Sequence, residues 1–100
     1  FTPTESKYAG KLCGGVQLLT PDRASFRPFR TGVAMVKAVH DLYPKKFKFL
    51  AGTPNHFDRL AGVSWVRENI IAGKSIAEIE AKWHADEAAF RETRKPYLLY

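Results

Sequence analysis

The chain has 100 residues, and its 45% hydrophobic and 13% aromatic content indicates one ordered domain rather than a disordered tail. The formal net charge of +6 arises within residues 1–50, which hold nine basic and three acidic side chains, whereas residues 51–100 hold seven of each. No apolar run approaches the roughly 20 residues of a membrane span, and the single cysteine excludes an internal disulfide and a cysteine-rich zinc site.

The first part of the chain is expected to be mostly loop, with one short strand. Proline and glycine interrupt regular structure in residues 1–12, and residues 16–19 (VQLL) predict a strand that ends at Thr20-Pro21. Gly10, Gly14 and Gly15 match neither of the common phosphate-binding glycine patterns, and they precede a strand rather than a helix. Cys13 is expected to be a buried structural thiol rather than a nucleophile.

A long helix is predicted over residues 29–43, where apolar side chains recur at three- and four-residue spacing. Because a second apolar stripe runs beside the first, this helix is expected to be packed on two sides. Residues 45–50 then alternate phenylalanine with lysine, which predicts a half-buried strand at a sheet edge. The first stripe comprises Phe29, Val33, Val36, His40 and Tyr43, and the second comprises Met35, Val39 and Leu42.

Three further helices are predicted in the second half of the chain. Two short ones are expected over residues 57–61 and 63–72, each followed by a glycine. A long one is expected over residues 76–93, because Ser75 and Glu78 form the sequence pattern of a capping box. Its buried stripe is predicted to consist of Ile76, Ile79, Trp83 and Phe90.

These elements together predict an α+β fold. A small two- to three-stranded sheet is expected to pack against two long helices and one or two short helices. The strands over residues 16–19 and 45–50 form the sheet, and residues 97–100 either add a third strand or dock as an apolar tail.

No self-sufficient active site, cofactor site or metal site is predicted. The three histidines do not have metal-ligand spacing; His40 is expected in the core and His84 on a solvated helix face. Glycoside hydrolysis needs two carboxyl groups about 5 to 10 Å apart. Most acidic residues of the second half look like caps or solvent-facing charges, so no such pair is identified, and no residue of the chain is predicted to be catalytic.

The basic first half also raises the possibility of an anionic partner. Aromatic and basic residues alternate over residues 26–30 and 45–49, which resembles a surface that stacks bases and contacts phosphates. Core aromatics flanked by solvent-exposed charges explain the same residues, and we therefore predict no nucleic-acid partner. A free-standing basic module that binds anionic glycan or nucleic acid is the alternative function, and surface solubility alone also explains the charge.

Several segments, taken in order, resemble the C-terminal domain of NamZ-type exo-β-N-acetylmuramidases, which are peptidoglycan glycoside hydrolases. Each segment alone is a weak signal, but their order and spacing along the whole chain are specific. They are residues 1–4 (FTPT), 7–10 (KYAG), 13–17 (CGGVQ), 22–23 (DR), 42–44 (LYP), 57–62 (FDRLAG), 71–73 (IAG) and 94–100 (RKPYLLY).

The resemblance implies an enzyme that releases N-acetylmuramic acid from the non-reducing ends of peptidoglycan fragments. It implies that residues 1–100 form a single C-terminal accessory domain that is inactive alone. A larger, Rossmann-like N-terminal domain of the same polypeptide would carry the catalytic carboxylates, and the cleft would lie where the two domains meet. It also implies a bacterial, extracytoplasmic protein, either periplasmic or secreted.

Three residues are predicted on this basis to bind the peptidoglycan-derived saccharide: Lys7, Tyr8 and Arg23. Tyr8 is expected to stack on a sugar ring or donate a hydrogen bond. Lys7 and Arg23 are expected to meet a carboxylate, for which the guanidinium of Arg23 is well shaped. Each also has an ordinary explanation, namely an interface aromatic, a solvated lysine and a salt-bridged arginine.

Overall fold

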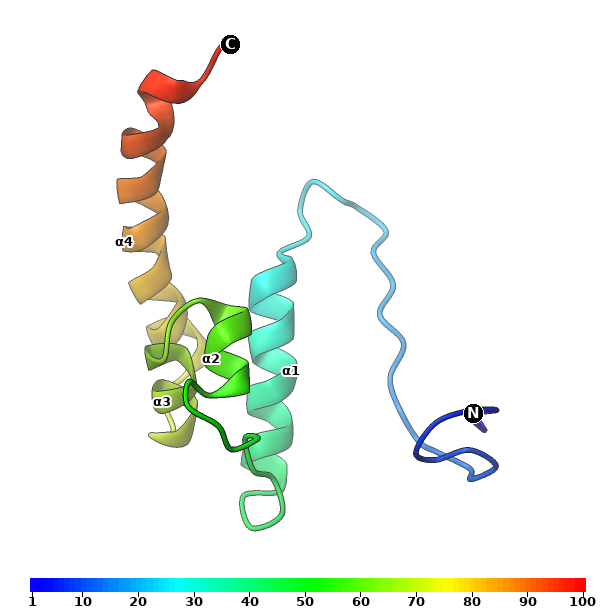
Figure 1. The fold of residues 1–100 in the computed structure, drawn as a ribbon. Coiled ribbons are helices and arrows are strands. Elements are labelled where there is room, and N and C mark those ends of the chain that lie inside the picture. Colours follow the sequence, from blue (N-terminus) through cyan, green and yellow to red (C-terminus); the bar gives the residue numbers. More distant parts are fainter.

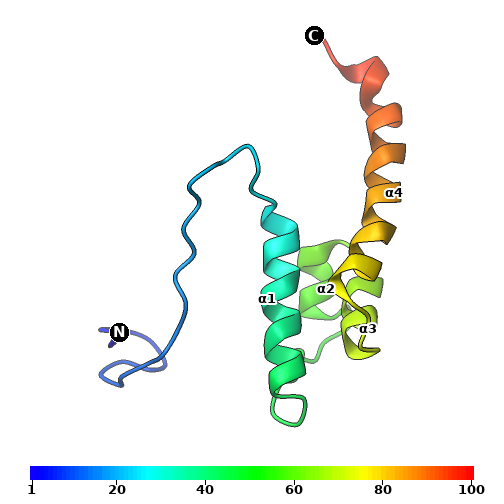
Figure 2. The same cartoon turned by 180° about the vertical axis from the view of Figure 1, so that it is seen from behind.

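The computed structural model describes all 100 residues, and every regular element in it is a helix (Figure 1). The long helices α1 and α4 flank the short helices α2 and α3; α1 packs against α3 and α4, and α2 packs against α3. Residues 1–27 leave this bundle as an extended arm (Figures 1 and 2). The elements are α1 (Pro28–Leu42), α2 (His56–Ala61), α3 (Trp65–Ile71), α4 (Ile76–Arg94) and the 3-10 turn η1 (Lys95–Tyr97).

The four predicted helices are confirmed, with ends displaced by no more than two residues. Local chemistry sets several of these ends. Pro28 opens α1, where its missing N–H needs no partner. The side chain of Asn55 accepts a hydrogen bond from the Phe57 N–H at 3.0 Å and caps α2. Gly62 ends that helix with a φ of 79°, a left-handed conformation that favours glycine.

The predicted capping box at the start of α4 is present. Ser75 Oγ accepts the Glu78 N–H at 3.2 Å, and Glu78 Oε2 accepts the Ser75 N–H at 2.8 Å. The hydrogen bonds that the Glu78 carboxylate accepts from the Ser75 N–H and from Ser75 Oγ lower its pKa, because they favour the charged form. Two backbone donors at the helix start are thereby satisfied.

Ser75→Ala is therefore expected to lower the free energy of unfolding by about 1 kcal/mol, measured by urea denaturation followed by circular dichroism. Ser64→Ala is the matched control, because Ser64 precedes α3 without a side-chain capping bond. We expect this control to change the free energy by less than about 0.5 kcal/mol. If both variants lowered the free energy of unfolding equally, the capping box would not contribute to stability.

A small core lies where α1, α3 and α4 meet. Five side chains are buried there, all of them apolar, and aromatic and aliphatic neighbours cover its edges. Helix α4 continues past this core (Figure 1), so the prediction that Phe90 belongs to its buried stripe is wrong; its side chain is 63% exposed. The buried residues are Val33 from α1, Val66 and Ile70 from α3, and Ile79 and Trp83 from α4.

Helix α1 is covered on one side only, which corrects the prediction of packing on two sides. Val33 is buried, Val36 lies at the edge of the core, and His40 packs edge-on against Phe47 with ring centroids 5.8 Å apart. The second stripe remains exposed. It consists of Met35, Val39 and Leu42.

The predicted α+β fold is wrong, because no residue of the chain is in a strand. Residues 45–50 do alternate as expected, with Phe47 and Phe49 half-buried and the lysines exposed. Phe49, however, packs edge-on against Phe57 of α2 at 5.1 Å, not against the face of a sheet. Residues 16–19 lie in the extended arm, and residues 97–100 belong to η1 and the chain end. Alternation of apolar and charged residues indicates which side chains point inward, but a strand also needs a neighbouring strand with which to form hydrogen bonds.

An ion pair joins the short helices α2 and α3. Arg67 donates from Nε to Asp58 Oδ1 and from Nη2 to Asp58 Oδ2, both at 2.8 Å, and both side chains are half-buried. The hydrogen bonds from Arg67 lower the pKa of the Asp58 carboxyl. A carboxyl whose pKa is lower in the folded state stabilises the protein above its unfolded pKa, and this contribution is lost as pH falls through the folded pKa.

We therefore expect the free energy of unfolding to fall below about pH 4. Between pH 6 and pH 3, it is expected to fall less in Asp58→Asn than in the wild type. The measurement is the urea midpoint at each pH. Asp86→Asn is the control, since Asp86 is exposed and forms no ion pair. If Asp58→Asn kept the full pH dependence of the wild type, the Asp58–Arg67 pair would not contribute to it.

Candidate functional site

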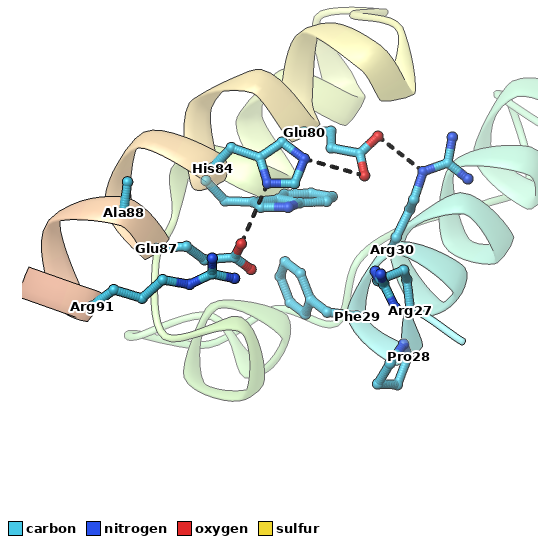
Figure 3. Close-up of a pocket in the computed structure, with 10 residues that line it drawn as sticks. Arg27, Pro28, Phe29, Arg30, Glu80, His84, Glu87, Ala88 and Arg91 are labelled. Carbon is cyan, nitrogen blue, oxygen red and sulfur yellow. Dashed lines mark hydrogen bonds and ion pairs between the residues drawn. The ribbon is translucent and has the colours of Figure 1, made fainter. Parts of the chain in front are cut away.

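The largest hollow of the molecule lies between the start of α1 and the middle of α4 (Figure 3). Its volume is about 520 Å³, which is within the range of small-ligand sites. We call it the α1–α4 pocket. Its lining consists of Arg27, Pro28, Phe29, Arg30, Glu80, Trp83, His84, Glu87, Ala88 and Arg91.

A chain of ion pairs crosses the α1–α4 pocket (Figure 3). Arg30 Nε lies 2.9 Å from Glu80 Oε2, which ties α1 to α4. The ring of His84 lies between two carboxylates, with Nε2 3.6 Å from Glu80 Oε1 and Nδ1 3.3 Å from Glu87 Oε2. Only the contact with Glu87 is within hydrogen-bond distance, and the contact with Glu80 is an ion pair when the imidazole is protonated.

The floor of the pocket is aromatic. Phe29 meets Trp83 edge-to-face, with ring centroids 5.0 Å apart and planes at 72°. Trp83 is a core residue, so the floor is fixed to the bundle, while Phe29 remains 43% exposed toward the hollow. An apolar ring beside a few charged groups is typical of small-ligand sites, in which the polar groups fix the orientation of the ligand.

Arginine is the dominant charged residue of this region. Arg91 faces the pocket without an ion pair, and Arg27 donates from Nη1 to the backbone oxygens of Ala24 at 2.8 Å and Phe26 at 3.3 Å. Arg27 and Arg30 also line a second hollow of about 300 Å³, between α1 and residues 19–26. Three guanidinium groups against two carboxylates leave a positive surplus, which suits an anionic ligand.

The structure places Lys7 and Tyr8 together, but at the far end of the arm. Lys7 Nζ lies 5.6 Å from the centroid of the Tyr8 ring, and both side chains are exposed. They belong to a loop over residues 1–13 that is closed by two hydrogen bonds between the backbones of Phe1 and Cys13. Cys13 is half-buried rather than buried, and its Sγ lies 3.4 Å from the Lys11 carbonyl oxygen.

Arg23 lies at the other end of the arm, in a turn beside the second hollow. Asp22 fixes this turn, because its carboxylate accepts the N–H groups of Ala24 at 3.0 Å and Ser25 at 3.2 Å. Hydrogen bonds from Ser25 and Ala24 accordingly lower the pKa of Asp22. Arg23 itself is exposed and makes no ion pair. The structure thus does not bring Arg23 to Lys7 and Tyr8 within one pocket.

The sequence alone did not reveal the α1–α4 pocket. Its pattern predicts Glu80 and Glu87 as solvent-facing charges; Glu87 is exposed, but Glu80 is half-buried and paired with Arg30 of α1. A signal was present in the spacing, because His84 and Arg91 occupy the same face of α4 as the two glutamates. The missing information was the partner across the pocket, since Arg30 is 50 residues away in the chain.

The two carboxylates of the α1–α4 pocket do not resemble the catalytic acid pair of a glycosidase. Glu80 and Glu87 are its only carboxylates, and Glu80 is already paired with Arg30. A general acid needs surroundings that keep it protonated, which is the opposite of an arginine ion pair. No three side chains among the histidines, cysteine and acids lie close enough together to bind a metal ion, and no helix is long and apolar enough to cross a bilayer.

Comparison with known proteins identifies the family. The family described as "Exo-beta-N-acetylmuramidase NamZ, C-terminal" matches residues 1–100. The chain is also 45% identical, over all 100 residues, to the protein named peptidoglycan beta-N-acetylmuramidase NamZ from Bacillus subtilis (strain 168), and it spans 24% of that relative's length. No solved structure matches. The chain therefore belongs to the family of NamZ C-terminal domains, as its sequence motifs predicted.

Proposed function

We propose that this chain is the cleft-completing C-terminal domain of an exo-acting β-N-acetylmuramidase. The enzyme would release N-acetylmuramic acid from the non-reducing ends of peptidoglycan fragments, outside the bacterial cytoplasm. The observation that carries the proposal is the family match over the whole chain, together with 45% identity to a named muramidase. The catalytic carboxylates are proposed to lie in an N-terminal, Rossmann-like domain of the same polypeptide, which accords with a chain that spans 24% of its relative.

The positive groups of this chain fit the proposed substrate. Muramic acid carries a lactyl carboxylate, and peptide stems add further carboxylates. We propose that Arg91 and Arg27 in the α1–α4 pocket bind such carboxylates, since guanidinium groups match them with two parallel hydrogen bonds. The exposed ring of Phe29 would cover the apolar side of a sugar. Lys7, Tyr8 and Arg23 stay proposed contacts, made where the arm meets the catalytic domain.

The activity is tested with the full polypeptide and a chromogenic N-acetylmuramic acid glycoside. The expected result is release of the chromophore, and loss of activity when residues 1–100 are deleted. Absence of release from properly folded polypeptide, with tight and salt-sensitive binding of single-stranded DNA, would instead support a nucleic-acid-binding module.

Reversing one charge tests the arm as part of the substrate site. Arg23→Glu in the full polypeptide is expected to raise KM for muramyl substrates about tenfold, the effect of roughly 1.4 kcal/mol, with kcat unchanged. Lys45→Glu is the matched control, because Lys45 is an exposed base without an ion pair just beyond the far end of α1. If KM were the same for both variants, Arg23 would not be part of the substrate site.

A further inference from the structure

The arm has an extended backbone without any hydrogen-bond partner over residues 14–20. At one end the Cys13 N–H donates to the Phe1 carbonyl oxygen at 2.8 Å, and at the other the Asp22 turn begins. Between these points no backbone N–H or C=O of the arm forms a hydrogen bond within the chain. Both views show the arm passing clear of the helices (Figures 1 and 2).

The segment carries three exposed aliphatic side chains. Val16, Leu18 and Leu19 are 81%, 55% and 79% exposed. Covering a side chain of this size stabilises a protein by about 1.5–3 kcal/mol, so three of them together form a surface that favours a partner. Aliphatic residues on an extended backbone are typical of a strand that lacks its sheet.

Residues on both sides of the segment limit how far it could form backbone hydrogen bonds with another strand. Pro21 follows it and has no N–H, so a ladder of hydrogen bonds ends there. Gly14 and Gly15 precede it, and a Cβ added to Gly14 would meet nothing within 4 Å. Nothing inside this domain therefore requires a glycine at that position. A glycine there leaves room for the backbone of a neighbouring segment to approach closely.

The arm and the projecting end of α4 give the molecule an elongated shape (Figures 1 and 2). The radius of gyration is 17.1 Å, compared with about 13 Å for a compact domain of this length. The helical bundle has no sheet edge to offer, because helix backbones are hydrogen-bonded internally. A strand that pairs with residues 14–20 would therefore lie outside the bundle.

We propose that residues 14–20 act as a donor strand that pairs with the open edge of a β-sheet in the catalytic domain. The inference rests on the proposed function, which supplies that second domain; about three quarters of the B. subtilis relative lies outside the match. Pairing with a second copy of this chain is disfavoured, because two arms give only a two-stranded ribbon, which is marginally stable in water. A sheet edge would form hydrogen bonds with the backbone groups of the segment and would also cover its aliphatic side chains.

The test is amide hydrogen exchange of the full polypeptide under native conditions. We expect alternate amides within residues 15–20 to exchange about 100-fold or more slowly than in an unfolded chain, because ladder hydrogen bonds to the sheet edge protect them. Exchange of this segment at the unfolded rate would overturn the proposal. Protection that appears only as protein concentration rises would also overturn it, in favour of pairing between two copies.

Proline variants test the pairing directly. Because consecutive N–H groups of a strand point to opposite sides, either Leu18→Pro or Leu19→Pro removes an N–H from the proposed ladder, and that variant is expected to abolish the protection. Leu12→Pro is the matched control, since the Leu12 N–H also has no partner in this chain and its side chain is exposed. If protection survives in both Leu18→Pro and Leu19→Pro, or is lost equally in Leu12→Pro, the arm is not paired as a strand.

The same preparations separate this inference from the proposed function. A polypeptide that releases N-acetylmuramic acid but leaves residues 14–20 unprotected overturns the donor strand alone. A polypeptide with a protected arm and no muramidase activity overturns the proposed function and leaves strand pairing supported.

Discussion

Ile70→Ala is expected to lower the free energy of unfolding by about 2–5 kcal/mol. The side chain of Ile70 is fully buried in the small core that joins α3 to α1 and α4. Its truncation removes apolar contacts and leaves a cavity, and only four other side chains share that core. Because domains of this kind are stable by about 5–15 kcal/mol in total, the variant is expected to be partly unfolded at moderate temperature.

The neighbouring residue provides the matched control. Ile71 is the same residue type, one position further along α3, and it is 54% exposed. Ile71→Ala makes an identical chemical change and is expected to shift the free energy of unfolding by less than about 1 kcal/mol. Urea denaturation of both variants measures the difference, and equal costs would mean that α3 is rotated from the orientation described.

Arg91→Glu is expected to raise KM for carboxylate-bearing peptidoglycan fragments by about 10- to 150-fold, with little change in kcat. A hydrogen bond to a charged group contributes about 1.5–3 kcal/mol, which corresponds to that range. Arg91 is a candidate for this role because it lines the α1–α4 pocket without an ion pair of its own. A contact made equally in the ground and transition states changes KM rather than kcat.

Arg94→Glu controls for the overall charge of the molecule. Arg94 ends α4 three residues later, has no ion pair and does not line the pocket. The kinetics of the full polypeptide are expected to change little in this variant. A similar rise in KM for both variants would show that net charge matters and that the α1–α4 pocket does not bind the substrate.

The helices were predictable because their signals are local. The capping box at Ser75, the proline at the start of α1 and the glycine after α2 each act within a few residues, and the structure contains all three. The absence of a sheet was not predictable in the same way. Alternation at residues 45–50 correctly indicated which side chains turn inward, but pairing depends on a neighbouring strand that the alternation cannot reveal.

The site was harder to predict than the fold, because it combines residues distant in the chain. Arg30 and Glu80 meet across 50 residues, and Phe29 reaches Trp83 from the first turn of α1. Sequence spacing groups residues on one helix face, but it does not show which face meets another helix. The family resemblance, by contrast, depended on the order of short motifs and was confirmed over the whole chain.

The proposed function requires that the reacting acids lie outside these hundred residues. The most direct test is kcat of the full polypeptide carrying Glu80→Gln and Glu87→Gln together, which removes both carboxylates from the α1–α4 pocket. We expect kcat within a few-fold of the wild type, since glutamine keeps the size and much of the hydrogen bonding of glutamate. A loss of about 10²- to 10⁴-fold in kcat, the usual cost of removing a general acid or base, would contradict it.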